Sequence, residues 1–465
     1  MNIEVNPQFI PPLDPHFKPM VLFRNAYNKK VANSDDVQCV SIVLERHDEM
    51  RSRLDFKVLT VTEKNVEDTY LFVERTVKFL LWARGGWKLC FAGPNDIGQR
   101  LKEEYRLGGK RAFDAEHMEM AYGRPFEVEL LSESDLPEEY EKAVRIGGKP
   151  DGCRIGIDLG ASDYKISAVV DGEVLYSDEI PWDPKPQEDP QYHIRAMKNG
   201  IDICASKMER IDAIGVSSAG IYLDNEPRVA SLYRSVSEVD FSTVIRPLFK
   251  NLAKEYDVPL IAINDGDVSA LAGAQYLKKN GVIGLAMGSS EAVGYLDQEG
   301  YLKPWLNELA FAPVDFQKDA VEDEWSKDMG VGAMYFSQQA VNKLAVMAGL
   351  SFSEKMGLPT RLVEIQNKMK EGDETAHKIY ETIGIYLGYA MASYREFYDY
   401  NELLLLGRVS SGKGGDIIVE KAREVLAGEF SELGLNIHLP DEKFRRVGQS
   451  IAAASLPPSK LSLGA

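Results

Sequence analysis

A predicted β-hairpin between Arg154 and Lys165 constrains the fold of this chain more than any other stretch. An apolar run leads to Asp158 and enters the turn Gly160-Ala161-Ser162, and a second apolar run, 166–170, leaves it. Glycine lets the backbone of such a turn approach a phosphate, because no Cβ stands in the way. A carboxylate at the strand end can hold hydrated Mg²⁺, which prefers carboxylate and phosphate oxygens. An ordinary hairpin without a ligand is the alternative.

Composition and charge exclude several classes of protein. The chain is 44% apolar and 27% charged, as globular domains are, and its length predicts roughly three domains. No run of eighteen apolar residues occurs, so we expect no transmembrane helix and no membrane partner. The first residues lack the basic and apolar regions of a secretory signal. The net charge of -18 argues against a nucleic-acid partner, which needs a basic surface.

Cysteine and histidine spacing gives no sign of a metal site. No CxxC pair occurs, and the histidines never pair at ligand spacing, so neither zinc nor a disulfide framework is expected. A reducing, cytoplasmic location fits this pattern. The four widely spaced cysteines are Cys39, Cys90, Cys153 and Cys204.

Residues 1–150 read as a small mixed α/β module of unknown role. The first 38 residues are rich in proline and polar residues, so we expect them to be extended or loosely packed. An acidic and then glycine-rich stretch, 133–150, looks like a linker into the hairpin. The expected strands are 39–44, 56–61 and 87–92, and the expected helices are 69–83 and 94–105.

Strands and helices alternate after residue 153, which predicts an α/β architecture. A second strand–turn–strand unit, 282–296, follows the first after about 130 residues. This spacing predicts two related lobes that face a cleft. Further strands are expected at 213–217, 260–263 and 403–406, and helices at 194–208, 242–256, 270–277, 334–398, 416–427 and 441–454.

The segment from Ile261 to Asp267 carries the sharpest catalytic pattern. An apolar strand ends in Asn264 and Asp265, and ligands of open α/β sheets bind at the carboxyl ends of strands. Asp265 there can act as a general base for a hydroxyl that attacks a phosphoryl group. Alternatively, Asn264 and Asp267 cap the following helix, and both roles can hold at once.

Two further loops could bind phosphate. Gly288-Ser289-Ser290 forms the turn of the second hairpin, although Glu291 at its tip would repel an anion, and a plain turn is the alternative. The loop 407–414 nearly spells a P-loop but ends in Gly414, where Ser or Thr should ligate Mg²⁺. A glycine-rich contact of Gly407 and Gly412 with adenosine or a diphosphate is therefore favoured over a P-loop.

Taken in order, these motifs resemble the actin/hexokinase/heat-shock chaperone ATPase superfamily. Within it, residues 153–457 look most like the ROK family of sugar kinases and sugar-responsive repressors; residues 1–150 do not share the resemblance. The segments that carry it are Ile157-Asp158-Leu159-Gly160-Ala161-Ser162, Ile214-Gly215-Val216-Ser217-Ser218-Ala219-Gly220, Ile263-Asn264-Asp265-Gly266-Asp267 and Asn307-Glu308-Leu309-Ala310-Phe311.

The resemblance implies a sugar held by Asn264, Asp265, Glu308 and Gly220, with Asp265 deprotonating its hydroxyl. It implies Mg²⁺ at Asp158 and ATP spanning the two hairpins and the late glycine loop. The implied ATP contacts are Gly160, Ala161, Ser162, Lys165, Gly288, Ser289, Ser290, Gly407 and Gly412. A homodimer is also what the family implies.

The chain departs from the family pattern at several positions. Ala219 replaces proline and Asp267 replaces asparagine, while Glu291 and Val293 interrupt the second phosphate motif. The family's zinc-binding cysteine cluster is missing, and Phe311 stands in place of its histidine partner. The glutamate that often follows that cluster also has no match, since Ala333 lies near its place.

We therefore expect a two-lobed, actin-like (ribonuclease H-like) ATPase fold with an additional N-terminal α/β module. The expected parts are the module (1–150), a first lobe (151–270), a second lobe (271–440) and a C-terminal helix returning to the first lobe (441–465). The expected activity is that of a cytoplasmic, ATP-dependent carbohydrate kinase. A non-catalytic sugar or nucleotide sensor and another kinase of the superfamily are the alternatives.

Overall fold

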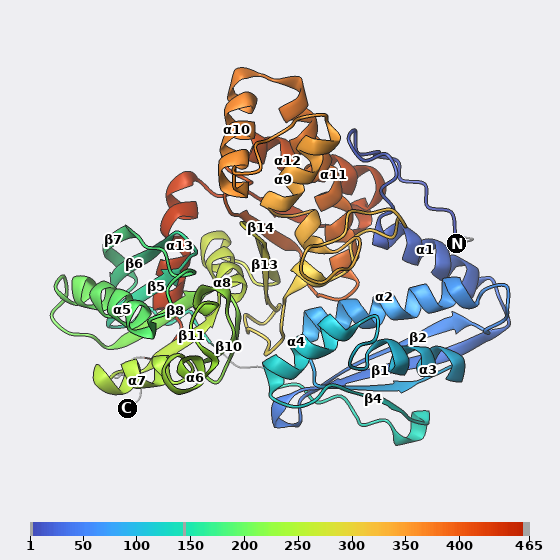
Figure 1. Cartoon of the computed structure of the whole chain (residues 1–465), viewed down its shortest axis with the longest axis horizontal. Coiled ribbons are helices and arrows are strands. Elements are labelled where there is room, and N and C mark those ends of the chain that lie inside the picture. Colours follow the sequence, from blue (N-terminus) through green and yellow to red (C-terminus); the bar gives the residue numbers. More distant parts are fainter. Residues whose placement is uncertain (1–2, 143–145, 459–465) are drawn as a thin grey trace.

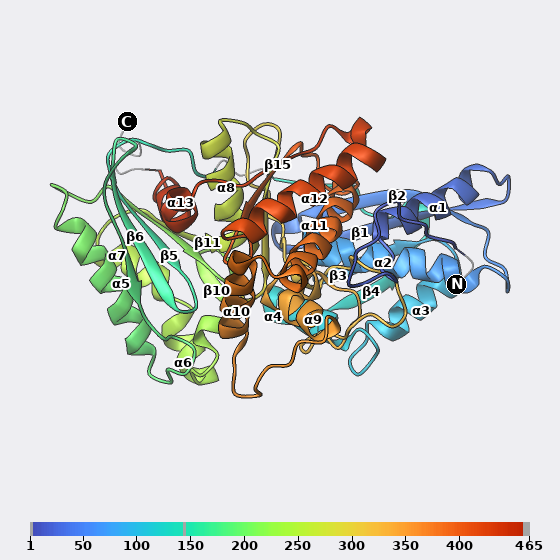
Figure 2. The same ribbon diagram turned by 90° about the horizontal axis from the view of Figure 1, so that it is seen from above.

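The computed structural model describes residues 3–142 and 146–458. Part of the expected linker, 143–145, and the end of the expected C-terminal segment, 459–465, lie outside these ranges. Three larger sheets, each with its own helices, form the molecule (Figure 1). We call them the N-terminal module, the first lobe and the second lobe. The second lobe lies between the other two (Figure 2).

The N-terminal module is built on a four-stranded sheet in the order β2-β1-β3-β4. Strands β1, β2 and β3 pair antiparallel, and β4 joins β3 in parallel. Helix α2 is buried along most of its length. The elements are α1 (Met20–Ala32), β1 (Val37–Glu45), β2 (Arg51–Leu59), α2 (Val66–Arg84), β3 (Lys88–Ala92), α3 (Asn95–Glu104), α4 (Ala112–Tyr122) and β4 (Glu127–Leu130).

The expectation that residues 1–38 are extended or loosely packed is wrong for residues 20–32. They form helix α1, which buries Met20, Phe23 and Tyr27 and contacts helix α11 (Glu374–Arg395) of the second lobe. The last proline, Pro19, lies directly before the helix, where a fixed φ is tolerated. The expectation rested on the proline and polar content of the segment, and it overlooked the helical spacing of these apolar residues, which continues to Val31.

The first lobe contains a five-stranded sheet in the order β11-β8-β5-β6-β7. Strands β5, β8 and β11 are parallel, whereas β5, β6 and β7 form an antiparallel meander. Pro247 interrupts the helix expected at 242–256, so the chain forms a π-helical turn, Phe241–Ile245, before α7. The main elements are β5 (Cys153–Leu159), β6 (Asp163–Val170), β7 (Glu173–Pro181), α5 (Pro190–Ala205), β8 (Ala213–Ser218), β9 (Ile221–Leu223), β10 (Glu226–Val229), α6 (Glu238–Asp240), α7 (Leu248–Glu255) and β11 (Leu260–Asn264).

Helix α13 (Glu442–Ala454) returns to the first lobe and packs on its sheet opposite α5 (Figure 2). Two strand glycines make this close approach possible. A Cβ on Gly156 would lie 1.7 Å from the carbonyl oxygen of Ser450, and one on Gly215 would lie 1.7 Å from that of Ala453. The glycine in each strand therefore serves a backbone-to-backbone contact.

The second lobe has a four-stranded sheet in the order β13-β12-β14-β15. Strand β13 is antiparallel to β12, and the other pairs are parallel. The elements are α8 (Asp265–Leu277), β12 (Val282–Met287), β13 (Glu291–Leu296), α9 (Gln338–Met347), α10 (Leu358–Glu371), α11, β14 (Glu402–Leu406), α12 (Lys413–Glu429) and β15 (Asn436–His438).

The N-terminal module and the second lobe share one continuous hydrophobic core. It runs from Val40 and Phe72 of the module to Leu285 and Tyr386 of the second lobe. The first lobe has a separate core around its own sheet. The module also reaches the first lobe, because α4 contacts the hairpin formed by β9 and β10. It therefore contacts both lobes.

Candidate active site

The first hairpin places Asp158 at the end of β5 and Lys165 opposite it on β6. The Asp158 side chain accepts a hydrogen bond from Ser217 Oγ at 2.8 Å, and Lys165 Nζ lies 3.5 Å from its other oxygen. Burial alone would lower the pKa of Lys165, but the carboxylates of Asp158 and Asp163 outweigh it and raise that pKa. Lys165 is thus a firmly held cation beside the exposed turn.

An arginine of the second lobe reaches this turn. Arg408 follows β14, and its Nη2 donates to Ser162 Oγ and to Asp163 Oδ2, both at 3.0 Å. Burial would raise the pKa of Asp163, yet Lys165, Ser162 and Arg408 together lower it, so this carboxyl is ionised. Arg408 therefore ties the first hairpin to the late glycine loop across the two lobes.

The second hairpin turn lies next to that same loop. Gly407 has φ +94°, and a Cβ on it would lie 2.4 Å from the carbonyl oxygen of Met287. The N–H of Val409 donates to that oxygen at 3.1 Å. Ser289 and Ser290 are exposed, as are Gly412 and Lys413, the first residue of helix α12. All three loops expected to contact ATP therefore lie in one neighbourhood.

Glu291 does not occupy the tip of the second turn, contrary to the sequence-based expectation. It is the first residue of β13, its side chain is buried, and Tyr394 donates a hydrogen bond to it at 3.2 Å. Burial raises the pKa of Glu291 to about 8, and Glu308 adds to the rise. The alternation of a strand turns this side chain inward, so it does not repel an anion at the exposed serines.

The residues expected to bind the sugar come together where β11 meets α8. The Asn264 side chain caps the helix by accepting from Gly266 N–H at 2.6 Å. Its Nδ2 donates to the carbonyl oxygen of Gly220 at 2.7 Å and lies 3.4 Å from Glu308 Oε1. The capping role and the position beside Glu308 hold at once. Asn264, Gly220 and Glu308 therefore form one hydrogen-bonded group.

Neighbouring carboxyl groups raise the pKa values of Asp265 and Glu308 in this cluster. Burial raises the pKa of Asp265 to about 6, and the charge of Asp158 adds to the rise. Burial also raises the pKa of Glu308 to about 8, with contributions from Asp265 and Asp267. At neutral pH Asp265 is thus mainly ionised while Glu308 keeps its proton. Such a split suits a base beside a hydrogen-bond donor.

Several neighbours of this cluster had no recognisable sequence signal. Asn307 donates to Asp267 Oδ1 at 3.0 Å and accepts from the Tyr398 hydroxyl at 3.1 Å. Burial raises the pKa of Asp267 to about 7, and Asp265 adds to the rise despite the bond from Asn307. Asn307 has φ +54°, which asparagine tolerates, but nothing in one sequence marks it. These contacts join positions far apart in the chain.

The N-terminal module supports the segment that carries Glu308. The N–H groups of Leu306, Asn307 and Glu308 donate to carbonyl oxygens at the end of α2, those of residues 84, 83 and 82, at 3.0–3.3 Å. The ring of Trp82 packs against Phe311 with centroids 4.7 Å apart. Phe311, which stands in place of the family's metal-linked histidine, is thus held by an aromatic contact with the module.

No group of three or more His, Cys, Asp or Glu side chains that could hold a metal ion occurs within residues 3–142 and 146–458. The charge of Asp158 nevertheless contributes to the raised pKa of Asp265. Two carboxylates fit Mg²⁺, which proteins hold by one or two carboxylates together with substrate phosphates. In the same ranges, no helix is long and apolar enough to cross a membrane.

No protein-family model matches the sequence. No curated protein matches it either. Solved structures do match. A ROK family glucokinase from Streptomyces griseus, in complex with glucose and AMPPNP, superposes with a TM-score of 0.51 at 14% identity, over 65% of this chain and 98% of that one.

The same comparison finds a ROK hexokinase from Thermus thermophilus, with a TM-score of 0.51 at 17% identity over 67% of this chain and 99% of that one. It also finds a ROK family transcriptional regulator, a homolog of the E. coli MLC protein, with a TM-score of 0.51 at 15% identity. That match covers 65% of this chain and 78% of the regulator.

The chain has the ROK fold. The expected two-lobed, actin-like ATPase architecture is thereby confirmed. At these identities the similarity establishes the fold and leaves activity to the site itself. These matches include both kinases and a transcriptional regulator. The fold therefore does not distinguish a catalytic from a regulatory function, and the side chains of the site have to be considered.

Proposed function

We propose that this chain is an ATP-dependent carbohydrate kinase of the ROK type, which transfers a phosphoryl group from Mg-ATP to a sugar hydroxyl. The observation that carries the proposal is the cluster of Asn264, Asp265 and Glu308, with Asp265 at a pKa of about 6. A general base works best when its pKa lies near the operating pH.

The proposed reaction divides the work among these residues. Asn264, Glu308 and the carbonyl of Gly220 would bind sugar hydroxyls, and Asp265 would accept the proton of the attacking one. The hydroxyl oxygen then bonds to the γ-phosphorus as the bond to ADP breaks. Mg²⁺ at Asp158 would neutralise charge on the phosphates.

The ATP phosphates would lie among the three neighbouring loops. The first hairpin offers Gly160, Ala161, Ser162 and Lys165, and the second offers Gly288, Ser289 and Ser290. Gly407 and Gly412 would contact adenosine or a diphosphate at the beginning of α12, a 17-residue helix whose N-terminus favours anions. Lys165 supports this arrangement because it is a half-buried cation directly beside the turn.

We further propose a cytoplasmic location, and the division into module, lobes and C-terminal helix given above. The cysteines support a reducing compartment, since all four are free thiols and Cys90, Cys153 and Cys204 are buried. A homodimer remains a proposal from the fold, to be tested by light scattering of the purified chain.

A panel assay tests the activity directly. Purified protein is given ATP, Mg²⁺ and a series of hexoses and amino sugars, and ADP release is measured with each. Sugar-dependent release by the native chain supports the proposal. Absence of release with every sugar, or full activity of Asp265→Asn, rejects it.

The second candidate is a sensor that binds sugar without phosphorylating it. The bond from Arg408 to Ser162 and Asp163 favours it, because this side chain crosses between two of the loops proposed for ATP. One protein of the same fold is a transcriptional regulator. Calorimetry separates the candidates, since a sensor of this kind binds sugar with no measurable heat from ATP.

A further inference from the structure

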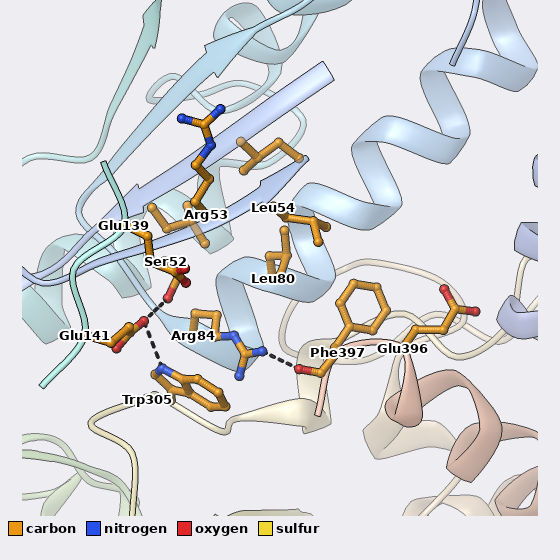
Figure 3. Close-up of a pocket in the computed structure, with 12 residues that line it drawn as sticks. Ser52, Arg53, Leu54, Leu80, Arg84, Glu139, Glu141, Trp305, Glu396 and Phe397 are labelled. Carbon is orange, nitrogen blue, oxygen red and sulfur yellow. Dashed lines mark hydrogen bonds between the residues drawn. The ribbon is translucent and has the colours of Figure 1, made fainter. Parts of the chain in front are cut away.

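A cavity of about 220 Å³ lies between the N-terminal module and the second lobe, and none of Asn264, Asp265 and Glu308 lines it (Figure 3). Its walls come from β1 and β2 of the module, from helix α2, and from the second-lobe residues Trp305 and Phe397. Half of the lining residues are apolar, with Ile42, Leu44, Leu54 and Leu80 among them, and the other half are polar or charged. The volume falls below the roughly 300–1,000 Å³ of drug-sized sites, so only a small ligand fits.

Arg84, at the end of α2, is the cation of this cavity. Its Cζ lies 3.2 Å from the centroid of the Trp305 ring, and its Nη2 donates to the carbonyl oxygen of Phe397. Its Nη1 is buried and has no hydrogen-bond partner among the described residues. Burial lowers the pKa of Arg84 to about 10, so the group stays charged at neutral pH. Arg84 is half-buried as a residue, but a buried donor of a cation that has no acceptor is costly unless an anion meets it.

Three carboxylates also line the cavity, and none of them is hydrogen-bonded to Arg84. Glu141 and Glu396 pair with other arginines, although the charge of Glu141 offsets part of the effect of burial on the pKa of Arg84, and Glu139 is exposed to solvent. Glu141 accepts from Arg46 at 2.6 Å and from Ser52, and also from Trp305 Nε1 at 3.2 Å. Glu396 accepts from Arg24 at 2.5 Å. Figure 3 shows Arg84 turned toward Phe397 and Trp305, with Glu141 bonded to Ser52 and Trp305 instead.

We propose that this cavity binds a small organic anion, whose carboxylate or phosphate group meets Arg84 and whose apolar body lies against the leucines of β1, β2 and α2. The inference is independent of the proposed kinase activity. The ligand would touch Trp305 and Arg84, which flank the backbone bonds that hold Leu306 to Glu308. It would thus lie directly behind the segment that carries Glu308.

Calorimetry on the full chain tests the proposal with benzoate and phenyl phosphate as probes, and with benzamide as the uncharged control. We expect binding of at least one anion and none of benzamide at the same concentration. Arg84→Gln should weaken the anion at least about tenfold, because a charge-assisted hydrogen bond is lost, while Arg84→Lys retains part of the affinity.

A second variant guards against loss of folding at Arg84. Leu54→Phe fills the cavity and leaves Arg84 in place, so it should also abolish binding. Arg100→Gln is the matched control, since Arg100 stacks on Tyr70 at 3.7 Å outside the cavity, and it should bind as the native chain does. Lys165→Gln should also bind normally, which separates this site from the phosphate loops.

The proposal is overturned if neither anion binds, or if benzamide binds as well as benzoate. It is equally overturned if affinity survives both Arg84→Gln and Leu54→Phe. Loss of anion binding in Lys165→Gln alone would assign the anion to the phosphate loops and likewise reject the cavity. None of these results bears on the sugar assay, so failure here and failure of the kinase proposal are distinguishable.

Discussion

The backbone N–H of Glu308 donates to the carbonyl oxygen of Trp82 at 3.0 Å. One residue belongs to the proposed sugar site and the other to a module that the ROK resemblance in the sequence does not cover. The end of α2 thus holds the backbone of the segment that carries Glu308. Two neighbouring bonds, from Leu306 and Asn307, repeat the contact. The module is thus a structural neighbour of the proposed chemistry.

The Trp82 ring also packs on Phe311, three residues after Glu308, and this packing predicts that the Trp82 side chain positions Glu308 for sugar binding. Trp82 is fully buried and bonds to Asp114 at 2.7 Å, so Trp82→Ala should cost about 3–5 kcal/mol of stability. In protein that remains folded, we expect the sugar KM to rise while the ATP KM changes little. Trp82→Phe retains the packing on Phe311 and should restore most of the sugar affinity. Equal changes in both KM values would contradict a positioning role.

Asp265→Asn should reduce kcat by about 10²–10⁴, because a general base contributes a factor of that size. Asp319→Asn is the matched control, since Asp319 is exposed and lies outside the cluster, and it should retain full activity. Kinetics of sugar-dependent ADP release measure both. A sugar dissociation constant that stays near the native value in Asp265→Asn distinguishes lost chemistry from lost binding.

The pKa of about 6 at Asp265 also predicts a pH dependence. The base works only when deprotonated, so kcat/KM of the native chain should fall as the pH drops through about 6. In Asp265→Asn the residual kcat/KM should no longer fall as the pH drops through about 6. A native profile that is flat from pH 5 to pH 8 would mean that Asp265 does not serve as the base.

Arg408→Ala should weaken ATP binding by about three- to tenfold. Without the guanidinium, the carboxylate of Asp163 still pairs with Lys165 at 3.2 Å, and the loops lose one positive charge that a polyphosphate would meet. The Arg408 side chain is 59% exposed, so its ion pair contributes at most about 1 kcal/mol and the melting temperature should hardly move. Arg195→Ala, which removes another exposed ion pair, is the control. Tighter ATP binding in Arg408→Ala would instead identify the arginine as an obstacle and favour the sensor.

Glu291→Gln should stabilise the chain at neutral and alkaline pH. The folded carboxyl has a pKa of about 8, above the usual value of 4.5, so the folded state holds a proton that the unfolded state releases between these values. The native chain therefore loses stability as the pH rises through this window, and glutamine removes the loss. At pH 7.5 we expect a gain on the order of 2 kcal/mol in urea or thermal denaturation.

The control for Glu291→Gln is Glu371→Gln, because Glu371 is exposed at the end of α10. Its denaturation midpoint should follow the native pH curve. If Glu291→Gln also follows that curve, the Glu291 side chain is ionised in the folded protein. That result would contradict its burial against Tyr394.

Local patterns explain why much of the site was predictable. Asp158, Asn264 and Asp265 each follow an apolar run, and the carboxyl ends of neighbouring parallel strands meet at one edge of a sheet. Glu291 was misjudged because the turn was read one residue too long, and strand alternation then turns the side chain to the opposite face. No role was predicted for Arg408, because only the glycines of its loop match a phosphate-binding pattern.

The sequence by itself determined the order of strands and helices, the two hairpins and the polar strand ends, because these depend on residues close together in the chain. Only the tertiary structure decided what surrounds them. The bond from Glu308 N–H to the Trp82 carbonyl joins residues more than two hundred positions apart, as do the bonds from Arg408 to Ser162 and Asp163. Burial likewise raises the pKa of Asp265 and lowers that of Arg84. This burial arises from packing between distant segments, which no local sequence pattern encodes.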